Sequence, residues 1–229
     1  MAQTAGPNDE LPEALSTLAS DTTELGIVVG EMFQYAAASL FGQEPEAARY
    51  AMQTRAWVTQ SVSILRRRSL QMIQRYAPQG DDLRHIAELQ QAASEYARIA
   101  ERAGHVAEHA LHLDGRADSL LASIHAGAPD LMRAFISEII QRMQGVFLVT
   151  AARNMPLAEQ LISGDADIEA LYQRIRALLD WRIRNDPFHA LPVQRLLIVT
   201  SDVRQIGTSI VAMCAAATGN PGAGRHPGL

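Results

Sequence analysis

The amino-acid sequence predicts an all-α protein made of two antiparallel three-helix bundles that are related by an internal repeat. Six long stretches carry apolar side chains at helical spacing, Pro or Gly separates them, and no stretch shows the sustained alternation that is typical of a strand. The chain has 229 residues, of which 48% are apolar and only 5% aromatic. Its many unbranched side chains favour helices, because they lose little rotamer freedom there.

Residues 10–113 are predicted to form the first bundle. Pro12 suits the first turn of the first helix, and Asn8 or Asp9 can cap that turn by accepting bonds from its free backbone N–H groups. Apolar residues then recur at helical spacing as far as Gly42, which can end the helix.

The second helix is expected to begin at Pro45 and to run through Tyr76, and the third to span residues 81–113 with Asp81 or Asp82 as its cap. The third helix has a narrow apolar stripe of mostly small residues, which let neighbouring helices approach closely. The stripe consists of Leu83, Ile86, Leu89 with Gln90, Ala93, Ala97, Ala100, Gly104, Ala107 and Leu111.

Residues 130–219 are predicted to form the second bundle, after a join at residues 114–129 where the helical pattern weakens. Asp130 opens the fourth helix, Pro156 the fifth, and the sixth begins near Leu191. The two tails, residues 1–9 and 220–229, have too few apolar side chains to pack and are predicted to be disordered.

Charge and composition exclude several classes of function. The formal net charge is −5, so nonspecific binding to nucleic acid is not favoured. All 20 basic residues are Arg, which excludes mechanisms that need a catalytic lysine. No nucleophile elbow or Gly-rich phosphate loop is present. We therefore expect no catalytic residues, and a protein that is not an enzyme.

The sequence also predicts a soluble, cytoplasmic protein. Cys214 is the single cysteine, so no internal disulfide can form. The N-terminal stretch lacks the apolar core of a signal peptide. No window approaches the ~20 uninterrupted apolar residues of a membrane span.

A polar column runs beside the small-residue stripe of the third helix. Glu101, His105 and His109 follow at four-residue spacing, so three ligand-type side chains project from roughly one face. They are the candidate metal ligands, and zinc would suit the imidazoles. The alternative is that all three are solvated or hydrogen-bonded side chains. Residues 105–109 also spell H-x-x-E-H, the zinc motif of one protease class, but no further ligand or sheet-based cleft accompanies it.

The same helix resembles the third helix of a PhoU-family repeat. That family's pattern is roughly D-L-R, a spacer, then L-E-R-I-G-D-x-A-x-N-I-A. The matching residues here are Asp82, Leu83, Arg84, Arg98, Ile99, Ala103 and Ala107, with Glu101 in place of the final Asp.

The second half repeats the frame, so the resemblance covers about residues 20–219 in order. Its fifth helix is similar to the family's A-x(6)-D-x-x-V-D-x-L-Y through Ala158, Asp165, Ile168, Glu169, Leu171 and Tyr172. Residues 203–208 repeat the L-E-R-I-G-D frame as V-R-Q-I-G-T. PhoU proteins are paired three-helix bundles, which agrees with the fold class that the helical pattern predicts.

The resemblance also implies metal sites, because many PhoU proteins bind iron, zinc or other metals through acidic E/D-x-x-x-D motifs. Here Arg55 and Ala97 replace acidic positions of the first half, and Arg204 and Thr208 replace acidic positions of the second. An arginine among would-be ligands repels a cation and can instead pair with Asp165. We therefore expect no metal cluster in the second bundle, and zinc or iron, if any, in the first.

By resemblance, the protein is expected to regulate phosphate uptake and phosphate-starvation signalling. It would act as a non-enzymatic adaptor between the ATPase of a phosphate ABC transporter and a sensor histidine kinase, so that it is peripheral to the membrane through its partners. A homodimer is compatible with this role. Two alternatives stay open: a zinc-dependent enzyme centred on Glu101, His105, Glu108 and His109, and a helical structural module of another assembly.

Overall fold

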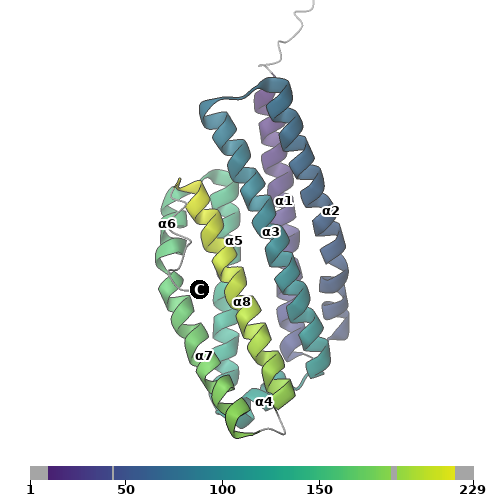
Figure 1. The fold of residues 1–229 in the computed structure, drawn as a ribbon, viewed down its shortest axis with the longest axis vertical. Helices are drawn as coiled ribbons and strands as arrows, with labels where there is room; N and C mark the ends of the chain where they lie inside the picture. The colour runs from purple at the N-terminus through teal and green to yellow at the C-terminus, as the bar shows by residue number, and fades with distance from the viewer. Residues whose placement is uncertain (1–9, 43, 187–189, 220–229) are drawn as a thin grey trace, which may run out of the picture.

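The computed structural model describes residues 10–42, 44–186 and 190–219, and these residues form helices and no strand. Figure 1 shows two groups of long helices that lie side by side. The helices are α1 (Leu11–Phe41), α2 (Pro45–Tyr76), α3 (Gly80–Leu113), α4 (Ala117–Ile124), α5 (Ala128–Ala152), α6 (Met155–Ser163), α7 (Asp165–Asn185) and α8 (Ala190–Ala217). The predicted all-α fold with two three-helix bundles is confirmed; the superposition of the two halves stays a prediction.

The first bundle consists of α1, α2 and α3, and its helix ends follow local turn chemistry. Gly42 ends α1, and α2 runs from Pro45 to Tyr76, as the sequence predicts. The predicted capping by Asp81 or Asp82 is wrong, because α3 already begins at Gly80, whose φ of 58° glycine adopts without strain. Both carboxylates lie in the first turn of α3 instead, where their negative charge interacts favourably with the positive end of the helix dipole. The predicted caps of α1, Asn8 and Asp9, lie outside the described residues.

Helices α5, α7 and α8 form the second bundle, and α4 and α6 are short. Within the predicted join, residues 117–124 form α4, which buries Ala117 and Leu121. The prediction of one fifth helix is wrong, because Gly164 separates α6 from α7. Arg142 of α5 donates hydrogen bonds to the backbone oxygens of Leu161 at 2.9 Å and Gly164 at 2.6 Å, and so satisfies carbonyls that the end of α6 leaves free.

Helix α3 lies at the centre of the molecule, because it packs against α1, α2 and α8 (Figure 1). It therefore buries more than one face, whereas the sequence predicts a single narrow stripe. Tyr96 and Val106 are fully buried although they lie outside that stripe. Leu83 and Leu111, at its two ends, are 41% and 37% exposed.

Helix α8 is the one described helix that is long and apolar enough to cross a membrane by length and composition. Charged residues interrupt this helix, so the expectation that no window approaches ~20 uninterrupted apolar residues is not contradicted. In the structure, 67% of the apolar window is buried inside the bundle. Its composition is that of a core helix packed on both sides, by α3 and by α7.

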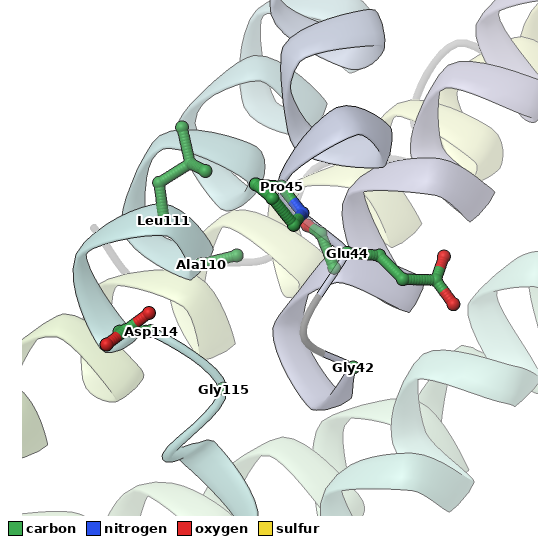
Figure 2. Close-up of a pocket in the computed structure, with 8 residues that line it drawn as sticks. Gly42, Glu44, Pro45, Ala110, Leu111, Asp114 and Gly115 are labelled. Carbon is green, nitrogen blue, oxygen red and sulfur yellow. The ribbon is translucent and has the colours of Figure 1, made fainter.

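The turn between α1 and α2 meets the end of α3 and encloses a hollow of about 380 Å³. Figure 2 shows Leu111 and Pro45 beside this hollow, with the carboxylates of Glu44 and Asp114 pointing in opposite directions. A ligand pocket normally has polar groups that converge on one point. This hollow lacks that feature.

Candidate functional site

The polar column predicted on α3 meets the second bundle. His105 Nε2 lies 3.2 Å from Glu101 Oε1, and His105 Nδ1 lies 3.7 Å from Oδ2 of Asp202 on α8. Arg102 donates to the other oxygen of Asp202 at 2.9 Å. His105 therefore stands between two carboxylates, one of them on the other bundle.

His109, the third predicted ligand, contacts a cation instead. Its Nδ1 lies 3.4 Å from a guanidinium nitrogen of Arg195 on α8. Burial lowers the pKa of His109, and the charge of Arg195 lowers it further, which favours the neutral ring. The structure thus joins Glu101 with His105 and leaves His109 with Arg195. Within the described ranges, no group of three or more His, Cys, Asp or Glu side chains is placed to hold a metal ion.

Asp202 is a buried carboxylate that the sequence pattern did not indicate as part of this site. It is 3% exposed and belongs to α8. A signal was nevertheless present in α3, where charged or polar residues recur every seven positions and so share a face. Those residues are Glu88, Glu95, Arg102 and His109. Such a face is either solvated or met by counter-charges of a neighbouring helix, and here α8 places Asp202 beside Arg102.

The acidic pair of the second bundle is closed by a buried arginine. Asp165 and Glu169 are one turn apart on α7, so their side chains project from the same face. Arg204 of α8 lies against both: its Nη2 is 2.9 Å from Asp165 Oδ2, and its Nε is 2.7 Å from Glu169 Oε2. Its Nη1 is 3.2 Å from the hydroxyl of Thr208. The predicted pairing of Arg204 with Asp165 is confirmed.

The cluster of Arg204, Asp165 and Glu169 is largely buried, and this strengthens the interactions between its charges. Only 7% of the Arg204 side chain and 12% of the Asp165 side chain are exposed to solvent. A guanidinium stays charged when it is buried, and it binds carboxylates through a planar fork of donors. An additional cation at this point would meet strong repulsion from that charge.

In the first bundle, an arginine contacts Glu101, the acidic residue that remains in the metal-type motif of this half, and this contact lies at the surface. Arg55 of α2 lies 3.4 Å from Glu101 of α3, and both side chains are about half exposed. Gly104 permits this approach, since a Cβ there would stand 3.3 Å from Arg55 Cδ. In the first bundle the arginine comes from the second helix, and in the second bundle from the last helix. Each arginine neutralises carboxylates of a neighbouring helix.

These features define a class of protein, a pair of helical bundles. Ion pairs within the chain satisfy its polar clusters, and its long helices expose extended faces to solvent. Comparison with known proteins finds a match within this class. Residues 22–110 match the model of the PhoU domain, so this part of the chain carries a PhoU domain.

Relatives and solved structures agree with this assignment. Over 124 residues the chain is 27% identical to the phosphate-specific transport system accessory protein PhoU homolog of Aquifex aeolicus (strain VF5). The match covers 54% of this chain and 52% of the relative, so the chain spans about half the length of the curated relative that it matches.

Two crystal structures show the same fold. PhoU from Pseudomonas aeruginosa superposes with a TM-score of 0.83 at 18% identity, over 90% of this chain and 96% of the other. The phosphate transport system regulatory protein PhoU from Streptococcus pneumoniae gives a TM-score of 0.78 at 15% identity, over 96% and 100%. At such low identity, these likenesses establish the fold alone.

The metal clusters that the family implies do not fit the second bundle. The guanidinium of Arg204 lies where a cation would have to bridge Asp165 and Glu169. In the first bundle, Ala97 replaces an acidic position, and Glu101 already contacts Arg55 and His105. The predicted first-bundle set of Glu101, His105 and His109 stays a prediction, and its metal would have to displace these contacts.

Elemental analysis of protein purified without chelator is expected to find little or no bound zinc or iron, because the internal arginines satisfy the carboxylates. Any ion present should be released when Glu101 and His105 are both replaced by alanine. Two or more tightly held ions per chain, or one that persists until Asp165 is changed, would contradict this expectation.

Proposed function

We propose that the protein is a PhoU-type regulator of phosphate uptake and phosphate-starvation signalling. It acts in the cytoplasm as a non-enzymatic adaptor between the ATPase of a phosphate ABC transporter and a sensor histidine kinase. The observation that carries this proposal is the PhoU domain at residues 22–110, and the fold of the chain is compatible with it. The matched Aquifex relative is named as an accessory protein of phosphate-specific transport, which supports the same role.

The chemistry of the polar clusters fits an adaptor. An adaptor needs stable surfaces and no reactive group, and here the clusters on α3 and α8 are satisfied largely by partners within the chain. Long helices offer extended faces for docking. Within the described residues, no observation favours the alternative of a zinc enzyme built on Glu101, His105, Glu108 and His109.

Binding of the full-length chain to the purified transporter ATPase and to the cytoplasmic part of the purified kinase tests the adaptor role. We expect both to bind, and a phosphate-starvation reporter to lose its repression when the chain is deleted. Variants Glu101→Ala and His109→Ala should repress nearly as well as the wild type, since partly solvated polar groups change stability by only about 0.5 kcal/mol. A normally folded His109→Ala variant without repression would favour the metal alternative. Repression with neither partner bound would favour a structural module.

A further inference from the structure

The seam between α1 and α2 carries an apolar stripe that the fold leaves exposed. Tyr50, Trp57 and Ile64 follow one another every seven residues along α2 and are 42%, 44% and 40% exposed. Seven residues are nearly two helical turns, so the three side chains share one face. Tyr35 of α1 is 46% exposed and packs edge-on against Tyr50, with ring centroids 4.8 Å apart.

The stripe lies along a groove. Trp57 and Ile64 line a hollow together with Glu24 of α1. A neighbouring hollow continues along the same two helices to Ala14 of α1 and Tyr76 of α2. From Ala14 to Tyr35 the seam is about 30 Å long, at 1.5 Å of rise per residue. That is the length of about six turns of an additional helix.

The two walls of the groove carry opposite charge. Helix α1 contains four acidic residues and no basic residue, whereas α2 contains six arginines and one glutamate. Two ion pairs cross the seam, between Arg68 and Asp21 and between Arg75 and Glu10. The exposed residues Glu24 and Glu31, seven residues apart on α1, and Arg67 of α2 have no ion pair with another described residue.

We propose that this α1–α2 seam binds an amphipathic helix of a partner protein. The partner helix carries apolar residues at heptad spacing against Tyr50, Trp57 and Ile64, and basic residues along the flank that faces Glu24 and Glu31. This inference rests on the proposed adaptor function and identifies the surface and the chemistry through which a partner is held.

An amphipathic helix fits the groove between α1 and α2 in shape and in charge. A helix laid between two others packs its ridges into their groove and completes a four-helix arrangement around the first bundle. Tyr and Trp are the side chains that most often dominate binding energy at such surfaces. An anionic membrane surface or a nucleic acid would be attracted by the arginines of α2 but repelled by the acidic wall of α1, whereas a helix with one basic and one acidic flank matches both walls.

The first test uses a designed probe. A helical peptide of about six turns has leucines at heptad spacing, arginines on one flank and glutamates on the other. In a Trp181→Phe background Trp57 is the only tryptophan, so its emission reports the peptide directly. We expect a shift to shorter wavelength on binding, and weaker binding by a peptide with glutamates on both flanks. The double variant Glu24→Arg/Glu31→Arg should reverse that preference.

Calorimetry with Trp57→Glu should show a loss of affinity of about 30-fold or more. Leu148→Glu, a matched change at a 57% exposed position of α5, should bind like the wild type. Equal loss in both variants, or equal binding of the two peptides, overturns the proposal. So does a wild-type dimer in sedimentation that Trp57→Glu converts to a monomer, because the occupant would then be a second copy.

Partner binding separates this inference from the proposed function. If the transporter ATPase or the kinase binds the chain and Trp57→Glu abolishes that binding, both stand. If it binds Trp57→Glu as tightly as the wild type, the adaptor role stands and the seam proposal falls. If the peptide binds and neither protein does, the seam stands and the adaptor role falls.

Discussion

Replacing Arg204 by alanine should lower the free energy of unfolding by about 3–5 kcal/mol. The substitution leaves Asp165 and Glu169 one turn apart on α7 without the guanidinium that now lies 2.9 and 2.7 Å from them. Removing one partner of a buried ion pair is costly, because the remaining charge stays largely out of water and loses its counter-charge. Urea unfolding at neutral pH measures the loss, provided that the slope with urea stays unchanged.

Arg55→Ala is the matched control. It also removes an arginine from a carboxylate on the neighbouring helix, but that pair is about half exposed and 3.4 Å apart. Exposed pairs contribute about 0–1 kcal/mol, so the control should stay close to the wild type. Similar losses in the two variants would show that burial does not set the importance of the Arg204 cluster.

A triple variant, Arg204→Met/Asp165→Asn/Glu169→Gln, separates charge from packing. It keeps side chains of similar size and removes all three charges. Replacing a whole buried ion cluster is often nearly neutral, so most of the stability lost in Arg204→Ala should return. A triple variant as unstable as the single one would assign the loss to packing around Gly207, where a Cβ would stand 3.0 Å from Ile139 Cδ1.

The fold could be predicted where local chemistry decides it. Pro45 and Gly42 act on their own turns, so the junction of α1 and α2 follows from the sequence. The break at Gly164 could not be predicted, because it depends on Arg142. The guanidinium reaches the end of α6 from α5, and a Cβ at Gly164 would stand 2.5 Å from its Nη2.

Some contacts of the candidate site could likewise be predicted from the sequence, whereas others depend on how the two bundles pack. The pairing of Arg204 with Asp165 could be predicted, because the repeat aligns two helices whose facing positions carry opposite charge. The contact of His105 with Asp202 depends on how the two bundles pack, and a repeat alignment holds no information about that. His109 was grouped with Glu101 by spacing alone, whereas α8 places Arg195 beside it.

Gly26→Ala should destabilise the protein by up to about 2 kcal/mol, and Gly104→Ala should not, although the sequence draws attention to Gly104. A Cβ at Gly26 would stand 2.6 Å from the hydroxyl oxygen of Tyr96 and 2.7 Å from Cζ of its ring. That ring is fully buried and packs against Phe147 of α5, with ring centroids 6.4 Å apart, which leaves it little room to shift. Overpacking of this kind typically costs about 1–3 kcal/mol.

The opposing term is helix propensity, because alanine is better than glycine inside a helix by about 0.8–1.0 kcal/mol. At Gly26 the clash exceeds this gain. At Gly104 the nearest atom is Cδ of the half-exposed Arg55 side chain, 3.3 Å away, which can shift at little cost. Gly104→Ala should therefore be neutral or slightly stabilising. Gly104→Leu, which has to displace both Arg55 and Met32, should cost roughly 1–3 kcal/mol.

Thermal and urea unfolding of the three glycine variants measure these differences, and Tyr96→Phe supplies a further test. Removing the hydroxyl takes away the closest atom but leaves Cζ at 2.7 Å. The double variant Gly26→Ala/Tyr96→Phe should therefore recover part of the loss and not all of it. Full recovery would place the whole clash at the hydroxyl. No loss in Gly26→Ala alone would mean that α1 and α3 can separate slightly, and that their contact is less tightly packed than the buried Tyr96 indicates.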